Sequence, residues 1–198
     1  MSLIPPLEDR QSGPESPKES SVLRTYLELP TLADLRTAPT PAVTGRLDSI
    51  PACPVPRWRA LYHQIGAAWH WHDRDQWSDD ALAERLAREA VAIFEVAVQT
   101  PDKAWHRPVG FLELERHDDG SVEIVYLGLD RAVHGQGLGG WLVGEAARHA
   151  AAMGNGRVVL NTCTLDAPAA LPNYLARGFR ITRTETYTVT LPDAPPRV

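Results

Sequence analysis

The stretch Val133-His134-Gly135-Gln136-Gly137-Leu138-Gly139-Gly140 decides the fold of this 198-residue chain. It follows an apolar strand pattern over residues 122–129 and opens a helical pattern over residues 138–153. Its four glycines leave the backbone bare at a strand-to-helix junction, where the first N–H groups of the helix have no partner within the helix. Because these N–H groups and the helix dipole both favour an anion, the stretch predicts a phosphate-binding loop.

Composition and charge indicate a soluble globular protein without a strong attraction to polyanions. The chain is 43% hydrophobic and 23% charged, as globular domains are. Its 20 basic and 25 acidic residues leave a net charge of −5, which argues against nucleic acid and anionic membranes as partners. No apolar run is long enough to cross a bilayer, and residues 1–6 lack the layout of a signal peptide. We therefore expect a cytoplasmic protein whose Cys53 and Cys163 stay reduced.

The sequence pattern predicts one domain between two irregular ends. Residues 1–20, rich in Pro, Ser, Glu and Gln, predict a disordered arm, residues 21–192 a single domain, and residues 193–198 a tail. Periodicity predicts strands over 22–29, 92–99, 108–116, 121–129, 157–163 and 179–191, and helices over 58–71, 79–90, 138–153 and 167–177. Ser78 is expected to cap the second helix and Gly154 to end the third, whereas the Pro-rich connection 38–56 has no clear pattern. This order predicts an α/β (α+β) fold, in which an antiparallel meander leads into one β-loop-α-β unit.

Two nucleotide-binding motifs fit part of the glycine stretch. Gly135-x-Gly137-x-x-Gly140 matches the dinucleotide fingerprint, but that motif belongs to the first strand of a doubly wound sheet with further βαβ units. Here the loop follows the end of a meander, and fewer than sixty residues remain after it. No Gly-Lys-Ser/Thr sequence follows, as a P-loop requires. The context therefore disfavours both nucleotide motifs.

Two motifs in the expected order resemble the GCN5-related N-acetyltransferases. The run Glu123–Gly139 resembles the acetyl-CoA-binding core of that family, and His134–Gly139 matches its signature Gln/Arg-x-x-Gly-x-Gly/Ala except at His134. Downstream, Asn173–Phe179 contains the family's Tyr-x-x-x-Gly-Phe. The resemblance extends from about Glu113 to Phe179. It implies a mixed, mostly antiparallel central sheet with helices on both faces.

The same resemblance implies acetyl-CoA as the co-substrate. It places the pyrophosphate on the glycine loop and the pantetheine arm along the strand edge at residues 127–129, where an amide-bearing arm can pair with free backbone groups. The residues expected to bind it are Leu127, Leu129, Gly135, Gln136, Gly137, Leu138, Gly139 and Gly140. The alternative explanation for the glycines is a tight turn with close helix packing. We expect no metal site, because His70-x-His72 has no third ligand nearby.

Acyl transfer to an amine requires a base for the amine and a proton for the departing thiolate. The resemblance assigns the proton donor to Tyr174, which otherwise is a core tyrosine; Pro172 just upstream departs from the pattern and could rotate Tyr174 away. Glu123 aligns with the glutamate that deprotonates lysine in the histone acetyltransferases of the family, although a charge at a strand end also explains it. Simple alternation places Glu123 on one face with Val125, Leu127 and Leu129. Glu113 and Glu115 on the neighbouring strand are alternative bases.

The acceptor is expected to be a primary amine, on a small molecule or a peptide. The aromatic segment from Trp58 to Trp77 forms a wall of the acceptor pocket in the resembling family, with Asp73 or a histidine as a contact to the amine; alternatively, it is a packed cover over the sheet. We expect an N-acetyltransferase that works by direct attack in a ternary complex, because Cys163 lies within a strand pattern. The alternatives are a non-catalytic CoA-binding module and a dinucleotide-binding oxidoreductase. The arm over 179–191 could supply the edge of a homodimer.

Overall fold

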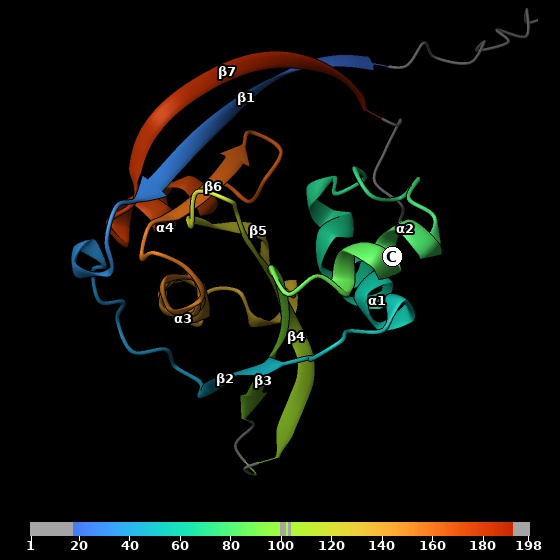
Figure 1. The fold of residues 1–198 in the computed structure, drawn as a ribbon. Coiled ribbons are helices and arrows are strands. Elements are labelled where there is room, and N and C mark those ends of the chain that lie inside the picture. Colours follow the sequence, from blue (N-terminus) through green and yellow to red (C-terminus); the bar gives the residue numbers. More distant parts are fainter. Residues whose placement is uncertain (1–17, 100–101, 103, 192–198) are drawn as a thin grey trace, which may run out of the picture.

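The computed structural model describes residues 18–99, 102 and 104–191. The elements run in chain order as β1 (Lys18–Leu29), η1 (Leu32–Asp34), β2 (Gly45–Ser49), α1 (Val55–Gly66), η2 (Ala67–Trp69), α2 (Asp79–Leu86), β3 (Val91–Gln99), β4 (Trp105–Arg116), β5 (Val122–Leu129), η3 (Arg131–Val133), α3 (Leu138–Met153), β6 (Val158–Cys163), α4 (Ala170–Ala176) and β7 (Arg180–Leu191). Figure 1 shows one sheet with α1 and α2 on one side and α3 and α4 on the other.

The seven strands form a single sheet in the order β2-β3-β4-β5-β6-β1-β7. Only β5 and β6 run parallel, and every other neighbouring pair is antiparallel. Strands β2 to β5 form the predicted meander, and β5, α3 and β6 form the predicted β-loop-α-β unit. The mixed, mostly antiparallel α/β fold with helices on both faces is therefore confirmed.

Both long helices form because their apolar residues recur at helical spacing and face the sheet. The buried positions i, i+3, i+4 and i+7 are Trp58, Leu61, Tyr62 and Ile65 in α1, and Val143, Ala146, Ala147 and Ala150 in α3. The small alanines allow α3 to lie close to the sheet, whereas the aromatic rings of α1 fill a thicker layer on the opposite face. The sheet is therefore covered on both sides at its centre.

The sheet divides at its centre. Strands β5 and β6 pair only between Val122–Ile124 and Val158–Leu160. Beyond Ile124, β5 continues beside β4 alone, and β6 continues beside β1 alone. Strand β1 pairs with β7 from Lys18 to Glu28, and the two form a long curved ribbon over this split (Figure 1). The split exposes one side of β5 along residues 125–129.

Most predicted elements are present, with α3 beginning and ending as predicted and Gly154 as its C-cap. Ser78 caps α2 as predicted, with its Oγ accepting from the Ala81 N–H at 3.2 Å. Strand β1 begins at Lys18, so residues 18–20 of the predicted arm are strand, because they pair with the end of β7. The rest of the arm and the tail over 193–198 lie outside the described residues.

Other elements also differ from the prediction: β4 begins at Trp105 rather than residue 108, and α4 covers Ala170–Ala176 rather than 167–177. The first long helix ends at Gly66, and His70 adopts a left-handed conformation with φ 55° that breaks the helical pattern predicted to Trp71. Helix α2 ends at Leu86 rather than near residue 90. The Pro-rich connection holds the short strand β2, which the sequence analysis missed. Pairing with β3 stabilises β2, and so short a segment shows no periodicity of its own.

Candidate active site

The glycine loop lies between the end of β5 and the start of α3, as predicted. Gly135 and Gly137 have φ angles of 75° and 81°, which side chains other than glycine adopt only with strain. A Cβ on Gly137 would also lie 3.1 Å from the Cα of Pro41. No side chain caps the start of α3, and its first turn holds no acidic residue. Its first N–H groups therefore remain available to an anion.

A cavity of about 950 Å³ occupies the split between β5 and β6. Its walls include most of the predicted site residues, namely Glu123, Leu127, Leu129, Gly135, Gly137, Gly139, Gly140 and Tyr174. The two other predicted binding residues lie differently. The Leu138 side chain is buried in the core, and the Gln136 amide donates to the Ala132 carbonyl at 3.4 Å. These two residues can therefore contribute to an anion site through their backbone N–H groups but not through their side chains.

A bulge in β5 changes which side chains share a face. The β4–β5 register shifts between Glu113 and Leu114, so that Tyr126 lies opposite Glu113 and Ile124 opposite Leu114. Glu123, opposite Glu115, therefore lies on the α1 and α2 side, whereas Leu127 packs in the core on the α3 side. The simple alternation that placed Glu123 with Leu127 and Leu129 is wrong, because the extra residue at the bulge reverses the pattern.

Tyr174 reaches the cavity from α4. The side chain is 8% exposed, and its hydroxyl makes no hydrogen bond to any residue that the structure describes. Burial and then the negative charge of Asp166 raise the pKa of Tyr174. Pro172 lies in the first turn of α4, where its missing N–H has no helical partner to lose, so it does not disrupt the helix. Tyr174 therefore lines the cavity with Pro172 in place.

Glu123 lies just before the point where β5 and β6 separate. Its carboxylate lies 3.2 Å from Nε2 of His117 and accepts a long hydrogen bond of 3.4 Å from the Asn161 side chain. The side chain is 27% exposed and borders both the main cavity and a smaller hollow of about 340 Å³. It is therefore half-buried and accessible to water.

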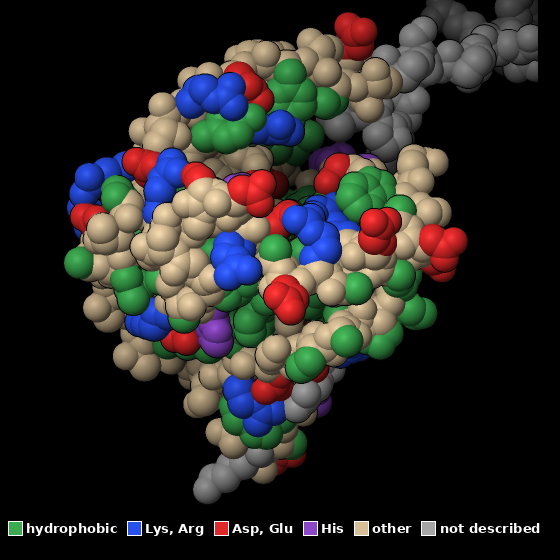
Figure 2. All heavy atoms as spheres, viewed as in Figure 1, with side chains coloured by type: hydrophobic (Ala, Val, Ile, Leu, Met, Phe, Trp, Pro, Cys, Tyr) green, Lys and Arg blue, Asp and Glu red, His purple; other side chains and the backbone are tan. Residues whose placement is uncertain are grey.

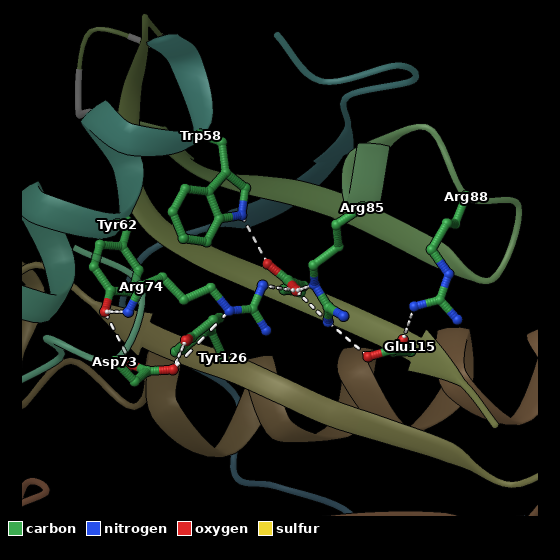
Figure 3. Close-up of polar contacts among 9 residues, drawn as sticks. Trp58, Tyr62, Asp73, Arg74, Arg85, Arg88, Glu115 and Tyr126 are labelled. Carbon is green, nitrogen blue, oxygen red and sulfur yellow. Dashed lines mark hydrogen bonds and ion pairs between the residues drawn. The ribbon is translucent and has the colours of Figure 1, made fainter. Parts of the chain in front are cut away.

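The alternative bases, Glu113 and Glu115, are held in an ionic network beneath α1 and α2, away from the cavity. Glu113 is fully buried and accepts hydrogen bonds from Trp58 at 2.7 Å, Arg74 at 3.2 Å and Arg85 at 2.8 Å. Glu115 binds Arg85 and Arg88, as Figure 3 shows. Neither carboxylate lines the cavity. They connect α2 and the α1–α2 connection to β4.

The aromatic segment divides into a buried part and a cavity wall. Trp58 and Tyr62 stack at 4.7 Å within the core, as the packing alternative expects. Residues 69–73, by contrast, line the cavity. Asp73, 63% exposed, accepts hydrogen bonds from the hydroxyls of Tyr62 at 2.9 Å and of Tyr126, which are close together in Figure 3. The segment is therefore a packed cover at Trp58 and Tyr62 and a cavity wall at residues 69–73.

Two basic side chains, His134 and Arg177, lie close to the glycine loop. Nε2 of His134 lies 3.0 Å from the Leu129 carbonyl, and the ring stacks on Trp69. Arg177, which the sequence analysis missed, is 9% exposed, and its Nε is buried without a hydrogen-bond partner. A Cβ on Gly140 would lie 3.3 Å from its Nη1, so the guanidinium is close to the first turn of α3.

The described residues hold no group of three or more His, Cys, Asp or Glu side chains arranged for a metal ion. Cys53 and Cys163 are both free thiols, as expected. Cys163 belongs to β6 but is its last residue rather than one in its middle, and it lines the cavity. Among the helices in the described ranges, none is long and apolar enough to cross a membrane.

The fold and the cavity define an acetyltransferase-type domain. The family model described as "Acetyltransferase (GNAT) family" matches residues 58–179, and the chain belongs to this family. No curated protein matches the sequence significantly.

Solved structures share the fold at low sequence identity. GCN5-related N-acetyltransferases from Kribbella flavida and Sphaerobacter thermophilus superpose with TM-scores of 0.54 and 0.56 at 19% and 17% identity, over 86% and 85% of this chain. A functionally unknown conserved protein from Staphylococcus epidermidis gives 0.55 at 15% identity over 86%. The matches cover 58%, 51% and 61% of those chains, so this chain spans little more than half their length.

Proposed function

We propose that this chain transfers an acetyl group from acetyl-CoA to a primary amine by direct attack in a ternary complex. One observation carries the proposal: the glycine loop, the unpaired side of β5 and the free hydroxyl of Tyr174 border the same cavity. A phosphate site, a strand edge and a proton donor are the three parts that this reaction needs. A tight turn alone would not require them together.

Coenzyme A fits the groups that the fold leaves without partners. The N–H groups at the start of α3 suit its pyrophosphate, and the free side of β5 from Val125 to Leu129 suits the amides of its pantetheine arm. Arg177 places a buried positive charge beside the positive end of α3, with no described carboxylate paired to it. An anion bound there offsets both charges. Arg177 thus supplies the fixed charge that His134 does not.

Bound acetyl-CoA supplies the thioester carbonyl that the amine attacks. Glu123 accepts the proton of the amine through water, because its carboxylate is half-buried at the cavity wall. Tyr174 donates its hydroxyl proton to the departing thiolate. The C–N bond forms as the C–S bond breaks, and the proton from the amine returns to Tyr174 through solvent. No group of the protein needs to carry the acetyl group.

Thermal unfolding with CoA or NAD, followed by release of free thiol from acetyl-CoA with a panel of amines, tests the function. We expect CoA and not NAD to raise the melting temperature, and amines to accelerate thiol release. Stabilisation by NAD alone would indicate the oxidoreductase. If CoA stabilised the protein but no amine accelerated thiol release from acetyl-CoA, the chain would be the non-catalytic module.

Glu123→Gln tests the base. A half-buried carboxylate that accepts a proton gives the pH profile of kcat/KM an acidic limb, which the variant should lose. An unchanged profile would remove Glu123 from this role.

We further propose that the protein acts in the cytoplasm on a small-molecule or peptide amine, without nucleic acid or membrane as a partner. The two free thiols and the net charge of −5 support this setting.

A further inference from the structure

One cationic side chain lines the cavity opposite the glycine loop. Arg24, on β1 of the curved ribbon, is the only Lys or Arg among the described residues of the cavity wall. Its Nη2 donates to the Tyr187 hydroxyl at 3.2 Å, and its guanidinium lies over the Tyr187 ring. Its Nε is buried without a partner. Tyr26 and Tyr187 are its hydrogen-bonding neighbours, and the remaining N–H groups of the guanidinium can bind another group.

Arg24 shares the nearby carboxylate of Glu185 with a second arginine. Nη1 of Arg24 lies 3.7 Å from Glu185, beyond hydrogen-bond distance. Glu185 accepts closer hydrogen bonds from Arg183 at 2.7 Å and from the Tyr26 hydroxyl at 2.6 Å. Two arginines thus share one carboxylate, and Arg183 is the better placed. Arg24 keeps a net positive charge at the cavity.

The cavity wall on the α1 side, at residues 69–73 and Tyr126, carries acidic and aromatic side chains together with His70 and His72. Asp73 presents an exposed carboxylate on the α1 side, and Glu123 presents another where β5 and β6 separate. The rings of Trp71 and Tyr126, with centroids 4.8 Å apart, lie on the same side as Asp73. Acidic groups beside aromatic rings suit a cationic amine. The cavity wall thus carries these carboxylates on one side and, on the ribbon, Arg24 as its one described Lys or Arg.

We infer that the acceptor is an amine that also carries a carboxylate, of the amino-acid class, and that Arg24 binds this carboxylate. An arginine with free donors suits a carboxylate in particular, because its planar fork matches the two oxygens. The cavity volume of about 950 Å³ lies within the range of small-molecule sites. This inference rests on the proposed acetyl transfer. It makes Arg24 a specificity-determining residue rather than a catalytic one.

Matched acceptors that differ only in the carboxylate test the inference. Thiol release from acetyl-CoA is measured with L-phenylalanine against 2-phenylethylamine, and with L-lysine against 1,5-diaminopentane, for the wild type, Arg24→Gln and Arg24→Lys. We expect the wild type to prefer the carboxylated member of at least one pair. Arg24→Gln should lower kcat/KM for that acceptor by about 10- to 100-fold, mainly through KM, and leave the plain amine within about twofold. Arg24→Lys should restore part of the loss.

Arg180→Gln is the control, because Arg180 lies on the same ribbon, binds Asp34 rather than Glu185 and does not line the cavity. It should leave the preference intact, and the activity on the plain amines reports whether each variant is folded. Equal rates for both members of each wild-type pair would overturn the assignment of Arg24 and leave the proposed function standing. An equal loss for both members in Arg24→Gln would also overturn it. If no amine in the panel caused thiol release from acetyl-CoA, the proposed function and the inference would both be overturned.

Discussion

At the residue scale, the two proposed catalytic side chains occupy opposite environments. Tyr174 is buried and holds its proton tightly, since burial and then Asp166 raise its pKa. Glu123 is half-buried and borders the cavity. The general acid must stay protonated, and the general base must reach the amine through water. Their different surroundings therefore agree with their different roles.

Tyr174→Phe should lower kcat by about 100-fold, because general acid catalysis contributes on that order. The KM for acetyl-CoA should change little. Because the pKa of Tyr174 is raised above its ordinary value of 10, the wild-type rate should show no alkaline limb from this group below pH 10. Steady-state kinetics across pH measure both. Tyr26→Phe, whose hydroxyl binds Glu185 away from the cavity wall, should remain fully active; equal rates for Tyr174→Phe and wild type would exclude the donor role.

Cys163 allows direct attack to be distinguished from a covalent route through an acetyl-cysteine, because it lines the cavity. Direct attack requires no acetyl-cysteine, so Cys163→Ser should keep kcat within about threefold of the wild type. Intact-protein mass spectrometry with acetyl-CoA and no amine should show no added acetyl group. A stable acetyl adduct lost in Cys163→Ser, with loss of turnover, would favour a covalent route instead.

At the element scale, the buried Glu113 connects the helical cover to the wall of the cavity. Arg74 donates to Glu113 at 3.2 Å, and its backbone N–H donates to the Tyr62 hydroxyl, which in turn binds Asp73. The guanidinium of Arg74 also lies over the rings of Trp77 and Tyr126. Figure 3 shows Tyr62 of α1, Tyr126 of β5 and Asp73 and Arg74 of the α1–α2 connection gathered together. The position of Asp73 therefore depends on a carboxylate in the core.

Glu113→Ala should destabilise the protein by about 3–5 kcal/mol, because it leaves the Arg74 and Arg85 guanidinium groups buried without their shared partner. Their side chains are only 8% and 11% exposed. Urea unfolding measures the free energy. Arg88→Ala is the matched control: its side chain is 52% exposed, and its loss should cost at most about 1 kcal/mol. A similar small cost for Glu113→Ala would show that the network contributes little.

The sequence predicts the elements that carry their own periodicity and fails where pairing partners decide. Helix α3 was predicted to the residue, because its alanine-rich stripe and flanking glycines are local signals. The bulge in β5 has no such signal, so the face of Glu123 was predicted wrongly. Glu113 is an alternative base in the sequence analysis but an ion-pair centre in the structure, since the arginines that bind it are far away in the sequence. Arg24 and Arg177 escaped notice for the same reason.

At the scale of the whole molecule, the curved ribbon serves two roles. Its β1 side supplies Arg24 to the cavity, while β7 is the outermost strand of the sheet on that side. Figure 2 shows basic, acidic and apolar side chains mixed over this face, with no single type dominant. An outer strand leaves backbone N–H and C=O groups free to pair with another strand. The ribbon is therefore the place where a second copy of the chain could extend the sheet.

We propose that two copies pair through β7, where Ile181 is 49% exposed. A lysine on an edge strand opposes strand pairing, so Ile181→Lys should shift the protein from dimer to monomer. Size-exclusion chromatography with light scattering at several concentrations measures the mass. Leu175→Lys is the control, because this leucine is 38% exposed on α4 rather than on the edge strand, and its mass should match the wild type. A wild-type monomer at every concentration, or a dimer that survives Ile181→Lys, would rule out this interface. Arg24 binds Tyr187 on β7 of its own chain. The monomeric variant should therefore keep the wild-type preference among acceptors.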